Sequence, residues 1–279
     1  MTAAPSKRIF SILENSLKCL VLAIAFNASA LAQFQAGTVS VLITSPNGTV
    51  VAADSRNHPL RGKISDDLCK ILTFGNKVAV TLGGVSAHTS PQHPIREWDG
   101  FKQLTLAYIK QSSSTQAFAD EWANEMRTLI LHDVSDNPLP LINALDGWNG
   151  SRGTVLTGIF VGSDDLEGLA VMLTLVKAGN GYQVLLNPLR HPSHSCDFAC
   201  AGVGAEIIDE IVANTTARAQ NWHRNMERMP PSQRAIEAIR LTIQHYPRPL
   251  DVGGKIDAVM VSKNGIHWIQ RKPNCPAGE

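Results

Sequence analysis

The stretch GTVSVLITSPNGTVVAADSR, which runs from Gly37 to Arg56, decides how the rest of the chain is interpreted. Apolar residues alternate through Thr38–Thr44, Pro46-Asn47-Gly48 supplies a turn, and the chain returns through Thr49–Ala53. Alternating runs on either side of an Asn-Gly turn are typical of a β-hairpin. The return strand ends in a charged residue, Asp54, so the hairpin carries a candidate functional group at its end.

Asp54 is one of two charged residues that strand alternation places on apolar faces. It shares a face with Val50, and Lys70 shares a face with Leu72 in a later strand-like run, Lys70–Phe74. A buried aspartate or lysine is costly alone and tolerable as a pair. The two residues are therefore predicted either to pair with each other or to lie at a solvated sheet edge.

The first 32 residues have the layout of an export signal. Basic residues precede an apolar run, Leu20–Phe26, and Ala30-Leu31-Ala32 offers a small-x-small cleavage site. The apolar run is shorter than the roughly 20 residues that a membrane span needs. We therefore expect residues 1–32 to be a signal peptide, 33–37 a propeptide, and 38–279 a single domain of a secreted or periplasmic protein.

Charge and cysteine content restrict the possible partners. The first 37 residues hold three of the 25 basic and one of the 24 acidic residues, so the remainder carries 22 and 23. This near-neutral balance gives no electrostatic basis for binding nucleic acid or an anionic membrane. An oxidising compartment favours one disulfide among the four remaining cysteines, with Cys196, Cys200 and Cys275 preferred over Cys69 and the pairing left open.

Histidines and cysteines gather between His191 and Cys200, where four potential zinc ligands fall within ten residues. Structural zinc sites usually take two ligand pairs from separate elements, so a disulfide or buried thiols is the favoured interpretation and no metal is predicted. Two further histidines, His88 and His93, fall in a polar loop and are interpreted as solvated loop residues.

The remaining pattern predicts an α+β fold. Helices are expected at 101–110, 117–131, 205–218 and 232–244, and residues 136–153 are expected to be a loop. Strands are expected at 70–74, 78–82, 154–161, 169–176, 182–189, 256–261 and 266–271. This order predicts a sandwich of antiparallel sheets with helix pairs on its outer faces.

Thr38 gives the hairpin a chemical interpretation. If the bond between Gly37 and Thr38 were cleaved, Thr38 would carry a hydroxyl and a free α-amine on one residue. Such an amine titrates near ~7.7–8 and can activate the hydroxyl as a general base. A carboxylate would hold the charged groups in place, and backbone N–H groups at Gly83-Gly84 could stabilise an oxyanion.

These residues resemble the proteasome-type N-terminal nucleophile (Ntn) hydrolases, the family of the proteasome β-subunits. The matching elements are Gly37-Thr38, AADSR at 52–56, Lys70 and Gly83-Gly84. The aspartate follows Thr38 by 16 residues, Lys70 follows it by 32 and Gly84 by 46, which are the separations expected in the family. The resemblance implies a four-layer αββα sandwich, with two antiparallel sheets between helix pairs.

The resemblance also implies roles for these residues. Thr38 would be the nucleophile and, through its amine, the general base. Lys70 would tune the hydroxyl and be oriented by Asp54, while the Gly84 N–H would stabilise the oxyanion. A largely apolar pocket would bind the residue before the scissile bond, which suggests a neutral apolar preference. The residues around this pocket would be Asn57, Leu68, Leu72, Leu82 and Ser86.

The C-terminal half departs from the family pattern in two places. The family has a Gly-Ser-Gly turn at the start of its third helix, where this chain has Gly202-Val203-Gly204. The family also has an aspartate followed three residues later by Ser-Gly-Gly, whereas Asp251-Val252-Gly253-Gly254 is two residues shorter and lacks the serine. Asp251 is our candidate for ordering the Thr38 amine, and the alternative is a turn aspartate before a strand.

The sequence therefore predicts an exported threonine-nucleophile amidohydrolase, a peptidase for short or unfolded peptides, active after autocleavage at Gly37-Thr38. No cofactor is expected. The resemblance implies homo-oligomers, among them rings, and the family's ATP-driven partner would be absent outside the cytoplasm. Two alternatives stay open: the same chemistry on a small-molecule amide, and a catalytically silent scaffold subunit.

Overall fold

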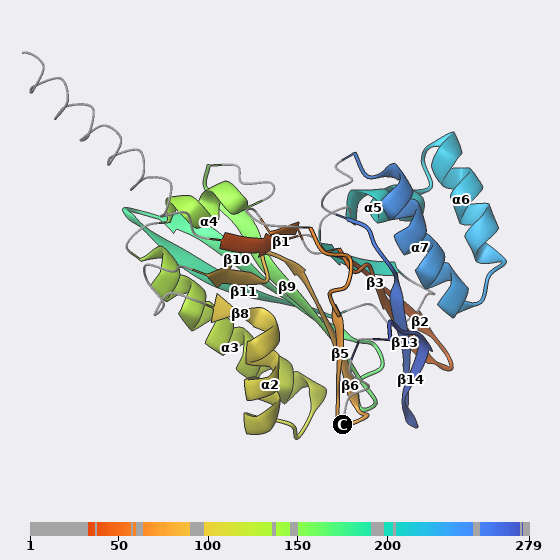
Figure 1. Cartoon of the computed structure of the whole chain (residues 1–279), viewed down its shortest axis with the longest axis horizontal. Coiled ribbons are helices and arrows are strands. Elements are labelled where there is room, and N and C mark those ends of the chain that lie inside the picture. Colours follow the sequence, from red (N-terminus) through yellow and green to blue (C-terminus); the bar gives the residue numbers. More distant parts are fainter. Residues whose placement is uncertain are drawn as a thin grey trace, which may run out of the picture.

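In a computed structural model of the chain, the structure describes residues 33–36, 38–56, 58–59, 64–89, 98–135, 138–145, 150–190, 198–202, 205–247, 252–273 and 275. These residues form a mixed α+β fold. Two main five-stranded antiparallel sheets lie face to face, and helices cover their outer sides (Figure 1). The predicted signal peptide, residues 1–32, lies outside the described residues.

The hairpin that opened the sequence forms the middle of the first sheet. Its strands pair in antiparallel register, with Ser40 opposite Ala53 and Ser45 opposite Gly48, so the predicted hairpin is confirmed. A short edge strand beside it was not predicted, because its pairing with the hairpin is long-range. In spatial order the strands are β12 (Phe198–Gly202), β2 (Val39–Ser45), β3 (Gly48–Ala53), β13 (Asp257–Ser262) and β14 (Gly265–Gln270).

The second sheet packs on the first through a continuous apolar layer. Leu42, Val51 and Val259 contribute to this layer from the first sheet, and Ala79 and Ile159 contribute from the second. Each of its strands was predicted to within a few residues. In spatial order they are β11 (Gly181–Arg190), β10 (Leu169–Ala178), β9 (Arg152–Gly162), β6 (Val78–Gly84) and β5 (Ile71–Phe74).

The outer face of the second sheet is covered by α2 (Gly100–Lys110), α3 (Thr115–Val134) and α4 (Leu139–Ala144). α2 begins where the Asp99 carboxylate accepts the N–H groups of Phe101 and Lys102. The two longer helices were predicted, whereas α4 lies inside residues predicted to be a loop. Prolines at its start concealed it, although the first turn of a helix tolerates proline.

The outer face of the first sheet is covered by α5 (Ala205–Ala213), α6 (Ala217–Glu227) and α7 (Pro231–His245). The prediction of one helix over 205–218 is wrong, because α5 ends at Ala213. The next residue, Asn214, has a φ of 54°, in the left-handed region. Thr216 then caps α6 by accepting the Ala219 N–H, and α7 confirms the helix predicted at 232–244.

A third sheet, of four very short strands, was not predicted, because such strands show no periodic pattern. In spatial order they are β4 (His58–Pro59), β1 (Gln33–Ala36), β7 (Ala87–Thr89) and β8 (Trp98–Asp99). Gln35 lies opposite Pro59 on one side and Ala87 on the other, and both pairings are antiparallel. Residues Gln33–Ala36 of the predicted propeptide therefore form the second strand of this sheet.

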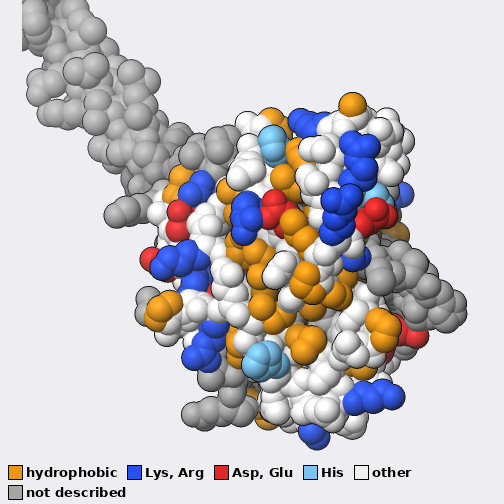
Figure 2. Space-filling model, turned by 90° about the vertical axis from the view of Figure 1, so that its right-hand side faces the viewer, with side chains coloured by type: hydrophobic (Ala, Val, Ile, Leu, Met, Phe, Trp, Pro, Cys, Tyr) orange, Lys and Arg blue, Asp and Glu red, His pale blue; other side chains and the backbone are white. Residues whose placement is uncertain are grey.

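Figure 2 shows the face that lies on the right of Figure 1, toward α6, α7 and β14. Hydrophobic side chains gather in the middle of this face, and Lys and Arg side chains lie above and around them. The partly buried apolar residues that pack on the core beneath α7 and β14 include Ile236, Ile243, Met260 and Ile269. Within the described part of the chain, no helix has the length and apolar character needed to cross a membrane.

Candidate active site

Asp54 and Lys70 form a fully buried ion pair. It joins the end of a strand in the first main sheet to the start of a strand in the second. The Lys70 Nζ atom lies 2.8 Å from Asp54 Oδ1, and both side chains have an exposed fraction of 0%. Asp54 directly follows β3, and Lys70 directly precedes β5. Of the two arrangements that the sequence left open, paired or solvated, the structure has the buried pair.

The reasoning from strand faces was nevertheless wrong in detail. Val50, which alternation placed with Asp54, packs toward α5–α7, whereas Leu72, placed with Lys70, packs toward α2 and α3. Strict alternation would therefore have sent the two charges to opposite outer layers. Both residues lie one position beyond a strand end, where the pleat no longer fixes the side-chain direction, and they can turn toward each other.

The Asp54 carboxylate connects Lys70 to the residue after Thr38. Its Oδ1 atom accepts the Val39 N–H at 3.0 Å, and its Oδ2 atom accepts the N–H groups of Gly253 at 3.0 Å and Arg56 at 3.2 Å. Thr38 itself is buried, with 4% of its surface exposed. The carboxylate thus joins the start of β2, the end of β3 and the turn before β13.

Burial is the main influence on the Lys70 ammonium, and it lowers the pKa of this group below its ordinary value of 10.5. The charge and the hydrogen bond of Asp54 act in the opposite direction and raise the pKa. Desolvation disfavours the charged form of an amine, so a lysine in this position gives up its proton at a lower pH than an exposed lysine. Such an amine can accept a proton from a neighbouring hydroxyl.

Gly84 ends β6 in a conformation that favours glycine. Its φ is 92°, and a Cβ atom there would lie 2.6 Å from the Val155 carbonyl oxygen. The following N–H, of Val85, donates to that same oxygen at 2.8 Å. The predicted oxyanion glycine therefore marks the point where the backbone leaves the ladder with β9 and turns toward β7.

The structure describes four of the five residues predicted to surround a substrate pocket. Leu82 is fully buried beneath Gly100, and the Ser86 carbonyl accepts the Gly100 N–H at 2.8 Å. Leu72 packs against the same α2–α3 core. The Leu68 N–H donates to the Ser55 carbonyl at 3.3 Å. Three further predicted residues, Gly37, Asn57 and Asp251, lie outside the described residues.

The turn before β13 lacks the serine that the family pattern has there, yet it contacts the site directly. The Gly253 carbonyl accepts the N–H groups of Ser55 and Arg56, at 3.1 and 3.0 Å. A Cβ atom on Gly253 would lie 2.5 Å from the Arg56 guanidinium, and one on Gly254 would lie 2.4 Å from the Ser55 hydroxyl. The two glycines let this turn approach the two residues that follow Asp54.

Arg56 and Asp66 form a second ion pair at the edge of the site. Their side chains make two parallel hydrogen bonds, of 2.6 Å to Oδ1 and 2.8 Å to Oδ2. This pairing raises the pKa of Arg56 and lowers that of Asp66. Sequence inspection missed the pair, although an arginine and an aspartate ten residues apart around a polar loop are a usable signal.

His88 is not the solvated loop residue that the sequence suggested. It lies in β7, is 4% exposed, and its Nδ1 atom is 2.7 Å from Asp133 Oδ2 on α3. Trp98 Nε1 donates to the same carboxylate oxygen at 3.0 Å. Asp133 therefore ties the small sheet to the helix layer below the second sheet. His93 lies outside the described residues.

Replacing Asp133 with alanine is expected to destabilise the fold by roughly 1–3 kcal/mol, because the buried Trp98 N–H loses its carboxylate acceptor. Thermal unfolding of the purified variant measures the loss. The matched control is Asp120→Ala on the same helix, where the side chain is exposed and the change should be within about 0.5 kcal/mol. Equal melting temperatures for the two variants would contradict the prediction.

The disulfide differs from the one favoured by the sequence. Cys69, the cysteine not preferred there, is bonded to Cys275 across a sequence separation of 206 residues. The reason is spatial: the loop before Lys70 and the C-terminal turn meet beside β13. Residues 191–197, which include most of the weighed zinc segment, lie outside the described residues. Among the described ones, no group of three or more His, Cys, Asp or Glu could hold a metal ion.

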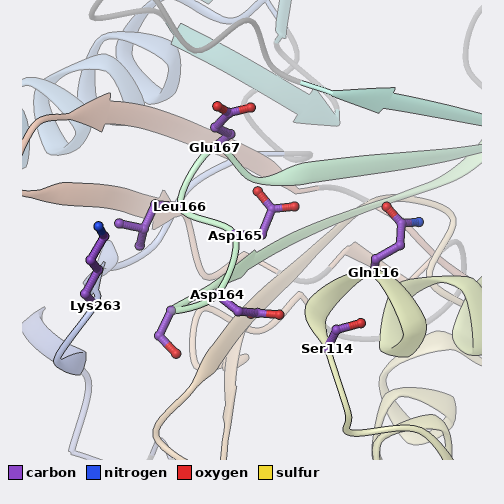
Figure 3. A pocket seen from close by; sticks show the side chains of 8 residues that line it. Ser114, Gln116, Asp164, Asp165, Leu166, Glu167 and Lys263 are labelled. Atoms are coloured by element: carbon purple, nitrogen blue, oxygen red, sulfur yellow. The ribbon is translucent and has the colours of Figure 1, made fainter.

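Figure 3 shows a pocket of about 520 Å³. It lies at the end of β2 that is far from Thr38. It is formed by the turn between β9 and β10, the start of α3 and the turn after β13, and the Thr49 hydroxyl at the hairpin end donates to the Leu166 carbonyl beside it. β2 separates Thr38 from that end by roughly 20 Å. The lining residues are Ser114, Gln116, Ser163, Asp164, Asp165, Leu166, Glu167 and Lys263.

This pocket is acidic, and one of its carboxylates, Asp164, has a local structural role. Asp164 accepts the N–H of Thr115 at 2.9 Å and also its hydroxyl, so it fixes the start of α3. These bonds lower the pKa of Asp164 against the opposing effect of burial. The pocket is therefore separate from the candidate site, and the position of Asp164 in it is explained by its bonds to the start of α3.

Comparison with protein-family models finds no match to this chain, and comparison with curated proteins finds none either. What the site does is therefore inferred from its geometry and chemistry.

Proposed function

We propose that the protein is a threonine-nucleophile amidohydrolase with the four-layer αββα fold of the Ntn hydrolases. One observation carries the proposal: the buried Asp54–Lys70 pair is hydrogen-bonded to the N–H of the residue after Thr38. A buried ion pair is weak support for stability on its own. Its location beside a buried threonine at the start of a strand supports a role in activating that threonine.

The first reaction proposed is cleavage of the chain itself. The Thr38 Oγ atom attacks the carbonyl carbon of Gly37, and its proton passes to the neutral Lys70 amine. Lys70 then returns this proton to the Thr38 nitrogen as the bond between Gly37 and that nitrogen breaks, which leaves Gly37 as an ester on the Thr38 oxygen and Lys70 neutral again. Water then hydrolyses the ester, which releases the Gly37 carboxylate and restores the hydroxyl beside a free α-amine. Lys70 suits this step because its lowered pKa increases the neutral fraction before any α-amine exists.

The second reaction is hydrolysis of a substrate amide by the same hydroxyl. The freed α-amine of Thr38 accepts the hydroxyl proton and returns it to the leaving amine of the substrate. Water hydrolyses the resulting ester, and the carboxylic acid product departs. The N–H of Gly84 is the proposed oxyanion donor, and Asp54 holds Lys70 in place throughout.

A peptide is the substrate class that β1 supports best. Residues Gln33–Ala36 lie as an antiparallel strand between β4 and β7 and lead to the proposed cleavage point. Once cleaved, this strand can leave, and an extended peptide can take its place through main-chain hydrogen bonds, as in other strand-addition complexes. Short or unfolded chains fit such a narrow strand position.

The experiment that tests the proposal is the intact mass and N-terminal sequence of the purified protein, compared with Thr38→Ala. We expect wild type to begin at Thr38 and the variant to retain Gln33–Gly37. Ser40→Ala, a buried hydroxyl two residues further along β2, is the matched control and should be processed like wild type. Identical, longer N-termini in wild type and Thr38→Ala would show a blocked amine and reject the proposal.

Two alternatives are separated by the same material. If processing occurs, hydrolysis of small amides but not of peptides assigns the chemistry to a small-molecule substrate. If no processing occurs, the result supports the alternative of a catalytically silent scaffold subunit. The missing serines near Val203 and Val252 agree with that alternative. Processing followed by peptide hydrolysis supports the peptidase.

We also propose that the protein is exported, needs no cofactor or nucleic acid, and forms homo-oligomers, among them rings. An apolar face such as the one in Figure 2 supports self-association, because exposed apolar surface favours burial. Light scattering of the purified protein measures the oligomer, and a monomer at all accessible concentrations would reject this part. An ATP-driven partner is not expected outside the cytoplasm.

A further inference from the structure

A second buried Asp–Lys pair adjoins the segment that leads into Lys70. The Lys272 ammonium lies 2.5 Å from Asp257 Oδ2 and donates to the Leu68 carbonyl at 2.6 Å. The Lys272 N–H donates to Asp257 Oδ1 at 2.9 Å. The Lys272 and Asp257 side chains are only 4% and 1% exposed. Lys272 therefore holds the backbone two residues before Lys70.

The same segment is held a second time by the disulfide. Cys69, between Leu68 and Lys70, is bonded to Cys275, and the Cys275 N–H donates to the Lys272 carbonyl at 3.1 Å. The C-terminal turn thus fixes two consecutive residues ahead of Lys70. Because the backbone cannot shift there, the position from which the Lys70 side chain starts is fixed as well.

Lys272 also acts on Lys70 through charge. The charged groups that influence Lys70 are Asp54 after β3, Arg56 and Asp66 in the following loop, and Lys272 after β14. Lys272 and Arg56 both lower the pKa of Lys70, in the same direction as burial, and Asp54 raises it. A like charge disfavours a second ammonium, so Lys272 favours the neutral form of Lys70.

Stability alone is a weak reason for this arrangement. A buried ion pair often adds little net stability, and apolar residues of similar volume frequently replace it without loss. Here a lysine is instead buried close to another buried lysine, and its ammonium is aimed at the backbone leading into that residue. The arrangement is explained if Lys70 has to be held in one place and kept ready to accept a proton.

We propose that Lys272 and Asp257 are positioning residues for Lys70: Lys272 holds the Leu68 carbonyl and places a second ammonium near the Lys70 amine, and Asp257 keeps Lys272 there. This inference rests on the proposed function, in which Lys70 exchanges a proton with the Thr38 hydroxyl. Neither residue touches substrate in this scheme, and their effect passes through Lys70.

The test is an NMR titration of the Lys70 ε-carbon signal in the full-length protein, assigned by its disappearance in Lys70→Arg. The variants are Lys272→Arg, Lys272→Met and the double replacement Asp257→Leu with Lys272→Met, which removes both charges at similar volume. Ile239→Ala, a core truncation on the buried face of α7, is the control for lost stability. The pH dependence of self-cleavage and substrate hydrolysis is measured beside it.

We expect the Lys70 titration midpoint to rise by about one pH unit in Lys272→Met and by less in the double variant, because the latter also loses the Asp257 charge. Lys272→Arg keeps the positive charge, so its Lys70 midpoint should equal that of wild type. Ile239→Ala should not move the Lys70 midpoint either. The pH at which cleavage begins should follow the midpoint. If Lys272→Met does not fold, the double variant decides.

An unchanged Lys70 midpoint in the folded variants overturns this inference, even if wild type is an active enzyme. A shifted midpoint in a protein that never cleaves itself supports the electrostatic role of Lys272 while rejecting the proposed function. The titration does not require turnover, so the two failures are distinguishable.

Discussion

Replacing Asp54 with alanine is expected to lower the free energy of unfolding by about 3–5 kcal/mol at neutral pH. The change leaves the Lys70 ammonium buried without this carboxylate, and the N–H groups of Val39, Arg56 and Gly253 lose the same acceptor. In a domain of this size such a loss corresponds to roughly 6–20 °C in melting temperature. Calorimetry or urea unfolding measures it directly.

Asp66→Ala is the matched control for this change. It removes a carboxylate from a different ion pair of the same loop, the one with Arg56, whose two side chains are 22% and 44% exposed. Solvent screens that pair, so its loss should cost less than about 1 kcal/mol. If the two alanine variants unfold at the same temperature, the Asp54–Lys70 pair has no special importance for stability.

The pH dependence of the Asp54→Ala defect has a definite sign. Lys70 has a folded-state pKa below its ordinary value, so as pH rises toward 10.5 the unfolded chain binds more protons and wild-type stability increases. Asp54 raises the pKa of Lys70, so without Asp54 this pKa lies further below its ordinary value. The stability gap between wild type and variant should therefore narrow as pH rises, because neutral Lys70 needs no counter-ion. The part of this stability gap that is due to the lost acceptor of the N–H groups remains.

The pairing of Asp54 with Lys70 could be predicted because it depends on burial and charge alone. Two opposite charges next to apolar strands have few alternatives to meeting each other. The directions of their side chains could not be predicted in the same way. Strand alternation ends where the ladder ends, and both residues lie one position past that point. The contact was right and the faces assigned to it were wrong.

The rest of the site depends on contacts between distant parts of the chain, and local patterns do not record these. The small sheet joins Gln33–Ala36 to β4 and β7 through pairs too short to show a period. The sequence held a usable signal for Asp257. Strand alternation places it on the same face as Val259 and Val261, which pack toward the second sheet. The alternation test applied to Asp54 would have marked it as a second buried charge.

Removing the disulfide, with Cys69→Ser and Cys275→Ser together, is expected to cost about 3–5 kcal/mol, the second large loss of stability in this protein. The bond closes a loop that spans 206 residues, and a crosslink over so long a loop strongly restricts the unfolded chain. The melting temperature should fall by roughly 6–20 °C.

The disulfide prediction separates a chain-wide effect from a local one at Lys70. A reducing agent should lower the melting temperature of wild type toward that of the double serine variant and leave the variant unchanged. If Lys272 still holds the Leu68 carbonyl after the bond is removed, the folded variant should keep the wild-type pH dependence of self-cleavage despite its lower stability. Displacement of the Lys70 midpoint would instead show that the disulfide, and not the ammonium contact, positions this segment. A melting temperature that does not respond to reduction would contradict the pairing itself.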